Sequence, residues 1–591
     1  MNKNIGMFFV AAAILLACSA QATTRHVVTV ERNVAVAMRD GVTLRADIYR
    51  PDTDEKFPVL LHRTPYDKSY GPSFGLKAAA QGYVVIFQDV RGRYASEGEW
   101  FPYKNEANDG YDTVEWAAAL PYGDGRVGMF GGSYTGATQL LAATTQPPHL
   151  AGITPNVAGS NYYYSLHYQG GAFAQWISQL WISEYLALDT LNRAMRKKVN
   201  LLHGTQVLPL VDYPLFESRE LPATSVASLA PYFLEWLDHP SYDEYWKRLS
   251  IDEHFSKITV PALHMGAWYD IALEGTLRNY VGITEHGASE AARRGQRLIV
   301  TVGGHAGDGP KIGAVDFGPA SKFDADEVSL RWYDYLFKGV QNEHATGKPV
   351  RIFVMGKNEW REEDAWPLAR AKNTRYFLHS AGTANGPTGN GSLSTVAPEQ
   401  ENPDRYVYDP KDPMPTIGGP LLSGQQLPLA ANGPQDQRPS ETRGDVLVYS
   451  TPPFEKDTEV TGPVSLELYV SSSAVDTDFT GMLVDVWPNG FAQNLTSGIL
   501  RLRYRDSFET PKLAVPGQTY HIKVDLWATS HVFLAGHRLR LEVSSSSFPR
   551  FDRNMNTGEE QARATRMLKA TNEVYHDQAR PSALIVPIVR P

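Results

Sequence analysis

RVGMFGGSYTGATQLLAA, residues 126–143, is the stretch from which the fold of this chain is predicted. It begins with a short apolar strand, Val127 to Phe130, and ends as a helix of small and apolar residues. Between them lies a G-x-S-x-x-G turn with Ser133 at its centre. A sharp strand-to-helix turn exposes such a serine, and only glycines tolerate the crowding around it. The helix that follows points its positive end at the serine. The pattern favours a nucleophilic Ser133 over a plain Gly-Ser loop.

Strands and helices alternate on both sides of this turn. A hairpin is predicted over 33–49, and a helix is predicted over 106–120. Apolar strands are predicted over 57–61, 82–90, 152–157, 261–267 and 298–302. Strands that alternate with helices predict an α/β fold with a mostly parallel sheet and crossover helices. This domain is expected in two parts, residues 23–160 and 259–347.

Two further segments differ from this domain in their pattern of apolar and turn-forming residues. Between 161 and 258 apolar residues recur at helical spacing, which predicts a helical cap over the carboxyl edge of the sheet, where ligands bind. The aromatic stripe around Phe173 and Trp176 is typical of a helix core, although a cap also lines a pocket. Residues 348–591 contain short β-rich runs separated by turns, which predicts a jelly-roll β-sandwich domain.

Residues 1–22 are interpreted as a signal peptide and excluded from the fold. An apolar run over 7–17 precedes Ala20-Gln21-Ala22, an A-x-A cleavage site, and is too short for a membrane span. Leu15-Leu16-Ala17-Cys18 also resembles a lipoprotein box, which would anchor the protein through a lipid on Cys18. Cleavage after Ala22 is preferred, because its motif is the cleaner one. Either route predicts an exported, periplasmic or secreted protein.

Composition narrows the classes of partner. The chain has 591 residues, of which 42% are hydrophobic and 20% charged, and a net charge of −9. The charge is spread out and no block of Lys and Arg occurs, which argues against nucleic acid as a partner. Cys18 is the only cysteine, so the mature chain is expected to have no disulfide.

A nucleophilic serine needs a base, and the base needs an orienting carboxylate. Asp270 lies just beyond the 261–267 strand, and His305 lies just beyond the 298–302 strand. Ser, Asp and His therefore follow three successive strand ends in the order that a hydrolase of this type requires. We predict a catalytic triad of Ser133, Asp270 and His305. The weaker candidates for the base are histidines 264, 254 and 239.

The oxyanion of the reaction needs two hydrogen-bond donors. The backbone N–H of Tyr134, the residue after the nucleophile, is the first candidate. The second is expected from the loop after the 57–61 strand, where the hydroxyl of Tyr66 is available. A packed loop aromatic is the alternative interpretation of Tyr66. Trp268, beside Asp270, joins Phe173 and Trp176 as a candidate wall of the substrate pocket.

Taken together these residues resemble the cocaine-esterase-like serine hydrolases, grouped with the X-Pro dipeptidyl-peptidase (S15) clan. The likeness covers nearly the whole mature chain, in family order: MRDGVTLRADIYRP (38–51), RTPYDK (63–68), QDVRGRYASEGEW (88–100), GGSYTG (131–136), HPSYDEYW (239–246), GAWYDI (266–271), VMGKNEWR (354–361) and YDPKDPMPTIGG (408–419). The resemblance implies an α/β-hydrolase domain, a helical cap and a C-terminal jelly roll. It also implies the triad above, and Tyr66 as oxyanion donor. Arg91 and Arg93, in the RGRxxSEG element, are interpreted as structural ion-pairing residues.

Two departures from the family pattern bear on the substrate. The histidine follows Thr-Val-Gly-Gly instead of the usual G-P-W-x, so the pocket wall beside it is expected to be more open. The branch that acts on α-amino acid esters carries acids two and three residues after the triad aspartate, where this chain has Ala272 and Leu273. The early cap stretch 160–170 contains no acid either. A buried ammonium group needs anionic partners, so free α-amino acid esters are expected to be poor substrates.

The prediction is therefore an exported serine hydrolase that cleaves an ester or amide bond of a small molecule through an acyl-enzyme. No metal-binding motif occurs, and the chemistry needs no metal or organic cofactor. An X-Pro dipeptidyl-peptidase is the alternative enzyme, and a non-catalytic jelly-roll binding protein is the alternative of another class. The sequence leaves the acyl group, the leaving group and the oligomeric state open.

Overall fold

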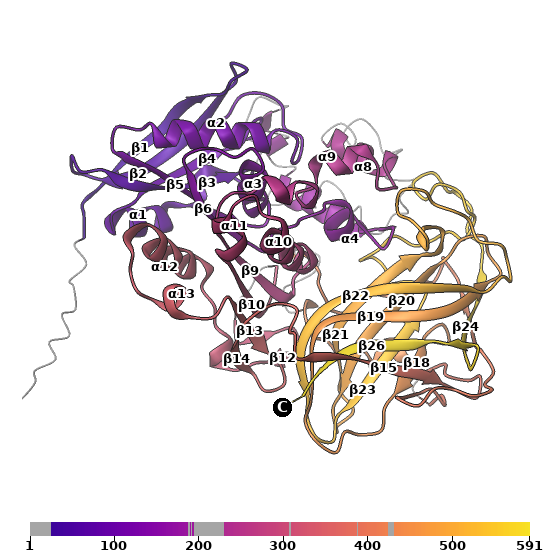
Figure 1. Cartoon of the computed structure of the whole chain (residues 1–591). Coiled ribbons are helices and arrows are strands. Elements are labelled where there is room, and N and C mark those ends of the chain that lie inside the picture. Colours follow the sequence, from indigo (N-terminus) through magenta and orange to yellow (C-terminus); the bar gives the residue numbers. More distant parts are fainter. Residues whose placement is uncertain are drawn as a thin grey trace, which may run out of the picture.

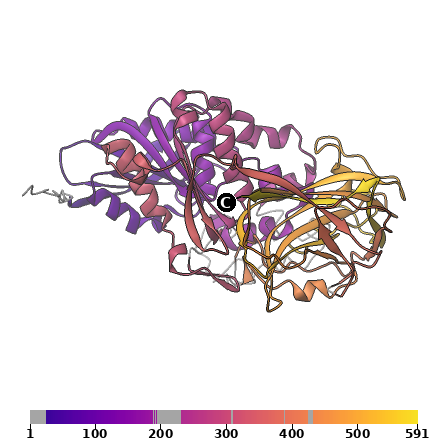
Figure 2. The ribbon, with the colours of Figure 1, turned by 60° about the horizontal axis from the view of Figure 1, so that its bottom comes forward.

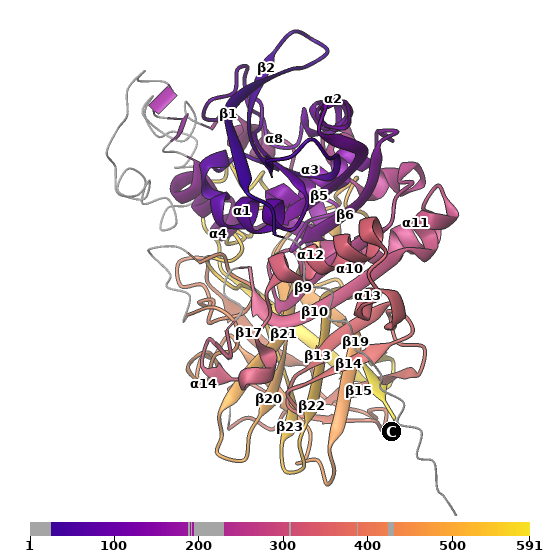
Figure 3. The same ribbon diagram turned by 90° about the vertical axis from the view of Figure 1, so that its left-hand side faces the viewer.

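The structure is a computed structural model that describes residues 25–186, 189–190, 192–193, 230–305, 309–386, 388–423 and 431–590. The predicted signal peptide, with Cys18, lies outside these residues. So does most of the segment between 187 and 229 of the predicted cap. Figures 1 and 3 show an α/β domain beside a β-rich C-terminal domain.

The first domain is built on a ten-stranded sheet of order β1-β2-β4-β3-β5-β6-β9-β10-β13-β14. Its strands are β1 (Val28–Ala37), β2 (Thr43–Pro51), β3 (Phe57–Thr64), β4 (Val84–Asp89), β5 (Gly123–Gly132), β6 (Leu150–Asn156), β9 (Ala262–Tyr269), β10 (Gln296–Gly304), β13 (Val350–Val354) and β14 (Glu359–Glu363). The neighbours from β4 to β13 are parallel, and β1, β2 and β14 are antiparallel. The mostly parallel sheet confirms the predicted fold class.

Helices cover both faces of this sheet (Figure 1). Side chains of α1 (Pro72–Ala80) and α12 (Ala325–Lys338) pack on one face, with Phe74 and Trp332 buried there. The other face is covered by α2 (Glu106–Ala118), α3 (Tyr134–Ala143), α10 (Leu273–His286) and α11 (Glu290–Arg294). The short α13 (Glu343–Thr346) precedes β13. Burial on both faces explains the continuous apolar runs of β4 and β9.

The change from the first sheet to the second does not fall at residue 348, where the sequence predicts the domain boundary. The structure corrects this boundary, because β13 pairs in parallel with β10 and β14 pairs with β13. Both strands therefore complete the α/β sheet, and the second sheet begins with β15. The loss of helical patterns after 348 marks the end of the crossover helices, not the end of the sheet.

The cap begins with a short π-helix and a small hairpin, and a second short π-helix follows its first α-helix. Its elements are η2 (Tyr163–His167), β7 (Tyr168–Gln169), β8 (Ala172–Phe173), α4 (Gln175–Leu180), η3 (Trp181–Leu186), α8 (Pro231–Asp238), α9 (Glu244–Leu249) and η6 (Asp252–Lys257). Its aromatic residues are buried together, among them Phe173, Trp181, Trp236 and Trp246. The stripe read from the sequence is thus the core of the cap.

The C-terminal domain is almost entirely β-structure (Figure 2). Its strands are β15 (Ala371–His379), β16 (Ser392–Ser394), β17 (Asp404–Tyr408), β18 (Leu447–Ser450), β19 (Thr458–Ser472), β20 (Asp478–Val486), β21 (Ala492–Arg501), β22 (Tyr520–Phe533), β23 (Arg538–Ser544), β24 (Ala570–Asp577), β25 (Arg580–Pro581) and β26 (Ala583–Val589). Its described residues also form a short α-helix, α14 (Arg438–Glu441), and a 3-10 turn, η9 (Leu502–Tyr504). Leu466, Leu526 and Leu541 lie in its hydrophobic core. The separate β-rich domain agrees with the predicted architecture.

The cap and the β-rich domain are joined at the tight turn of the β7–β8 hairpin. Gly170 accepts a hydrogen bond from the backbone N–H of Arg501 at 2.9 Å. A Cβ atom on Gly170 would lie 1.7 Å from the carbonyl oxygen of Ile499, and its φ is +55°. Only glycine fits there. Three residues on, the backbone N–H of Phe173 donates to the Asp552 carboxylate and its carbonyl accepts from the Asp552 N–H, each bond 2.8 Å long.

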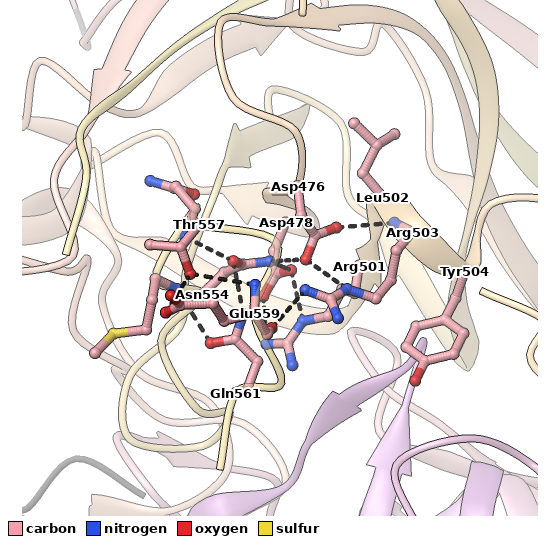
Figure 4. Close-up of polar contacts among 12 residues, drawn as sticks. Asp476, Asp478, Arg501, Leu502, Arg503, Tyr504, Asn554, Thr557, Glu559 and Gln561 are labelled. Carbon is pink, nitrogen blue, oxygen red and sulfur yellow. Dashed lines mark hydrogen bonds and ion pairs between the residues drawn. The ribbon is translucent and has the colours of Figure 1, made fainter. Parts of the chain in front are cut away.

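Behind this junction lies a closed network of buried charges, of which Figure 4 labels Asp476, Asp478, Arg501 and Asn554. Arg501 pairs with Asp478 and with Asp552, both at 2.9 Å, and these side chains are at most 3% exposed. Asn554 donates to Asp478 at 2.7 Å and to Asp476 at 2.9 Å. Every charge in the network therefore meets an opposite charge or an amide.

Among the described residues, none of the helices is long and apolar enough to cross a membrane.

Candidate active site

Ser133 lies at the sharp turn between β5 and α3, as the sequence predicts. Its φ is +58° and its ψ is −126°, a backbone conformation that a residue other than glycine rarely adopts. A Cβ atom on the preceding Gly131 would lie 2.3 Å from Thr135, and one on Gly136 would lie 2.8 Å from Ala158. The neighbouring glycines therefore make room for the turn. The backbone N–H of Ser133 donates to the carbonyl of Asn156 at 2.9 Å and holds the strained residue in place.

The structure brings the three predicted triad residues into one chain of hydrogen bonds. His305, at the end of β10, lies with its Nε2 atom 2.8 Å from the Ser133 hydroxyl. Its Nδ1 atom lies 2.6 Å from a carboxylate oxygen of Asp270, which follows β9. Asp270 is fully buried, whereas the His305 side chain is 11% exposed. A hydroxyl joined through an imidazole to a buried carboxylate is the arrangement that activates serine nucleophiles.

The other histidines weighed as a base lie elsewhere. His264 is buried within β9 with its Nε2 atom 2.7 Å from the side chain of Gln296, and burial lowers its pKa to about 4. His239 stacks on Tyr245 and bonds Asp243 at 2.6 Å. His254 belongs to η6. In the described part of the chain, no hydrogen bond joins any of the three to Ser133.

Tyr66 faces the same space as Ser133. The hydroxyl of Tyr66 accepts a hydrogen bond from the indole N–H of Trp181 at 2.8 Å. Burial raises the pKa of Tyr66 above its usual value, and the bonds with Trp181 and Ser133 offset only part of this rise. The hydroxyl therefore keeps its proton at neutral pH and is a hydrogen-bond donor.

Tyr134, the first residue of α3, is anchored from behind. Its hydroxyl donates to Glu106 at 2.8 Å and accepts from the backbone N–H of Tyr103 at 3.0 Å. Glu106 in turn pairs with Arg63 at 2.9 Å, and both side chains are almost fully buried. Burial raises the pKa of Glu106. This support was not predicted from the sequence, although Arg63 begins the RTPYDK motif.

A cavity of about 890 Å³ opens in front of Ser133, Tyr66 and His305. Its apolar wall comes from the loop before α2, the cap, the segment between β9 and α10, and a loop of the β-rich domain: Tyr103, Tyr162, Leu166, Ile177, Trp181, Ile271, Ala272 and Leu422. Glu184 also lines it. Glu184 lies in the cap beyond the 160–170 stretch where an acid was expected, and no pattern in the sequence marks it as a pocket residue.

The three predicted pocket residues are placed elsewhere, and their assignment is corrected. Trp268 is buried among other side chains and donates to the carbonyl of Phe353 at 2.7 Å. Trp176 donates to the carbonyl of Leu422 at 2.8 Å and lines a separate void of about 10 Å³. Phe173 packs against Tyr168 and Phe233 at the junction with the β-rich domain. Helical spacing identified a buried face but not which neighbour covers it.

Arg91 and Arg93 differ in what they bind. Arg91 pairs with Asp40 and Asp109, at 2.8 and 2.7 Å, as a structural ion-pairing residue would. Arg93 donates to the carbonyl of Pro65 at 3.0 Å and pairs with Asp189 of the cap at 3.4 Å.

The described residues hold no group of three His, Cys, Asp or Glu side chains suited to a metal ion.

Comparison with known proteins identifies the family. Residues 40–307 match the X-Pro dipeptidyl-peptidase (S15 family) model, and residues 342–585 match the model of its C-terminal non-catalytic domain. The chain is 38% identical to a cocaine esterase of Rhodococcus sp. (strain MB1 Bresler), over 95% of this chain and 99% of that protein.

Solved structures of the same architecture cover the whole chain. An aminopeptidase from a marine sediment Thaumarchaeota archaeon superposes with a TM-score of 0.80 and 25% identity, over 100% of this chain and 99% of that one. An α-amino acid ester hydrolase superposes with a TM-score of 0.78 and 25% identity, over 98% of both chains. The chain therefore belongs to the family of cocaine esterase and the S15 X-Pro dipeptidyl-peptidases, and it is a serine hydrolase.

Proposed function

We propose that this protein is an esterase that transfers the acyl group of a small-molecule ester to Ser133 and then to water. The observation that carries the proposal is the bond chain from Asp270 through His305 to Ser133, at the floor of an 890 Å³ cavity. Similarity to cocaine esterase over 99% of that protein favours esters over amides.

In the first half of the reaction, the Ser133 oxygen forms a bond to the acyl carbon while His305 takes the hydroxyl proton. Asp270 holds the imidazole in the required tautomer and stabilises the imidazolium. The oxyanion accepts hydrogen bonds from the Tyr66 hydroxyl and the Tyr134 N–H. His305 then gives its proton to the leaving alkoxide as the C–O bond breaks.

In the second half, His305 takes a proton from water, and the resulting hydroxide attacks the acyl-enzyme carbon. A second oxyanion forms in the same place. The bond to Ser133 breaks, its oxygen recovers a proton from His305, and the carboxylic acid leaves.

The test is a panel of aryl esters, anilides and X-Pro anilides, assayed with the wild type and with Ser133→Ala. We expect ester turnover well above anilide turnover, lost in Ser133→Ala together with stoichiometric labelling by a fluorophosphonate. Equal labelling of Ser133→Ala would contradict the proposed nucleophile. Faster cleavage of X-Pro anilides than of esters would replace the esterase proposal with the peptidase alternative.

We also propose that the enzyme does not select for an α-amino group. Ala272 lines the cavity where acids stand in the α-amino branch, and Glu274, one residue further than Leu273, is bonded to Arg278 and Ser165. Among the described residues, the carboxylates that line the cavity are those of Asp67, Glu184, Asp324 and Asp326, and Glu184 is the one in the cap. We expect the kcat/KM of an α-amino ester to be no higher than that of its des-amino analogue. A large preference for the amino ester that is lost in Glu184→Gln would refute this and identify Glu184 as the ammonium partner.

Export remains part of the proposal and rests on residues 1–22 alone. Mass analysis of the processed protein decides between its two routes. An N-terminus at residue 23 indicates simple cleavage, and an acylated Cys18 at the N-terminus indicates a lipoprotein.

A further inference from the structure

The oxyanion donor Tyr66 receives a hydrogen bond from a tryptophan of the cap. Trp181 is the first residue of η3 and donates its indole N–H to the Tyr66 hydroxyl at 2.8 Å. A phenol has one proton to donate and two lone pairs that accept. Because the indole occupies one lone pair, that side of the oxygen is filled, and the phenol proton is left for the space in front of Ser133. Accepting a bond also makes the phenol a stronger donor, since linked hydrogen bonds polarise one another.

Trp181 itself is held rigidly. Its ring lies parallel to that of Trp236, with centroids 6.2 Å apart and planes within 6°, and its edge meets Trp100 at 6.1 Å. It also packs against the ring of Tyr134, whose centroid is 5.9 Å away. The side chain is 6% exposed. One fixed indole therefore contacts both residues that supply the oxyanion donors.

Arg93 makes a second link between the same two segments. Its Nε atom donates to the carbonyl of Pro65, the residue before Tyr66, at 3.0 Å. Its guanidinium also donates to the cap, to the carbonyl of Leu186 at 3.3 Å and to Thr190 at 3.1 Å. Arg93 is 1% exposed. The loop that carries Tyr66 is therefore bonded to the cap at two points. Trp181 binds the Tyr66 hydroxyl, and Arg93 links the backbone of Pro65 to the cap.

We propose that Trp181 is a positioning residue for the oxyanion hole. Its indole N–H orients the Tyr66 hydroxyl toward the reacting carbonyl, and Arg93 fixes the loop beneath it. The cap thus completes the catalytic site as well as covering it. This inference rests on the proposed role of Tyr66 as oxyanion donor.

The experiment is a double-mutant cycle between positions 181 and 66. Trp181→Phe keeps a packed ring but has no N–H, and Tyr66→Phe removes the donor. The substrate is p-nitrophenyl acetate, whose small acyl group makes little use of the cavity wall. We expect Tyr66→Phe to lower kcat on the order of 10²-fold to 10³-fold, as loss of an oxyanion donor does. We expect Trp181→Phe to lower kcat about 10-fold with little change in KM, because it removes a hydrogen bond to the donor and not the donor itself.

The expected signature is non-additivity. Trp181→Phe should have almost no further effect in the Tyr66→Phe background, because there is no hydroxyl left to orient. Trp176→Phe is the matched control. It also removes a buried indole N–H from the cap, but that group is bonded to Leu422. We expect it to combine additively with Tyr66→Phe.

The possible outcomes separate this inference from the proposed function. A normal rate in Tyr66→Phe overturns the oxyanion role of Tyr66 and with it the role of Trp181, while the esterase activity through Ser133 stands. A slow Tyr66→Phe with a normal Trp181→Phe, or fully additive effects, overturns the role of Trp181 alone. If Trp181→Phe does not fold, replacement of the indole by the isosteric benzothiophene removes the N–H without changing the packing, and the same cycle applies.

Discussion

Asp270 of the α/β domain and Asp478 of the β-rich domain are both buried carboxylates, and they differ in where their hydrogen bonds lead. Asp478 bonds Arg501 and Asn554, which are themselves fully engaged within the network of Figure 4. Asp270 bonds His305, whose second nitrogen faces Ser133 and the cavity. A buried carboxylate whose bonds end on other charges stabilises a fold. One whose bonds end at a hydroxyl beside open space is available for proton transfer.

The largest expected effect tests the hydrogen bonds that lead from Asp270 through His305 to Ser133. Asp270→Asn should lower kcat on the order of 10⁴-fold, because the amide favours the wrong tautomer of the base. Its free energy of unfolding should change little by comparison. The measurements are ester turnover and urea unfolding of the same samples. A variant that keeps a large share of its activity would show that Asp270 does not orient His305.

The closed network should behave in the opposite way. Arg501→Met leaves Asp478 and Asp552 buried without their cation, and breaking a buried pair in this way costs about 3–5 kcal/mol of stability. Turnover per folded molecule should stay near that of the wild type on a small ester. Urea unfolding and active-site titration check the two parts. Unchanged stability would show that the charge network around Arg501 does not stabilise the fold.

The smallest effect concerns a third carboxylate cluster, at His576 of β24. Burial alone would lower the pKa of His576, but hydrogen bonds and charges of Asp404 and Glu401 outweigh it and raise the pKa. A raised pKa in the folded state stabilises the protein below the ordinary histidine pKa, and this contribution is lost as the pH rises through the raised value.

We therefore expect the melting temperature to fall by a few degrees between about pH 6 and pH 8 in the wild type. In His576→Gln this part of the pH dependence should be absent. Calorimetry across that range is the measurement, and an identical slope in the two proteins would show that His576 does not carry it.

Much of the candidate site was predictable because its signals are local. The glycines around Ser133 mark a strand-to-helix turn, and Asp270 and His305 each follow an apolar run that has to be a strand. Parallel strands place their carboxyl ends at one edge of the sheet, so their order in the chain is enough to bring the three residues together.

What the sequence did not predict depends on contacts between distant segments. The Trp181–Tyr66 bond joins residues 115 positions apart, and nothing in either local pattern indicates it. Trp268 was expected at the pocket because it lies two residues before Asp270, but closeness in sequence does not decide which distant side chains cover it. Its indole bonds β13 instead. The membership of β13 in the first sheet was also not predicted, because it depends on the pairing of β13 with β10 and not on a local pattern.

The position of β13 has a consequence for anyone dividing this protein. A fragment ending near residue 347 would lose β13 and β14 and leave β10, the strand that carries His305, as a bare edge. Unpaired strand edges recruit other chains and promote aggregation. Met355, just beyond β13, also exchanges backbone bonds with Ser530 and Val532 of β22, at 3.0 and 2.8 Å. A hydrolase domain transplanted without its partner is therefore expected to express as insoluble material.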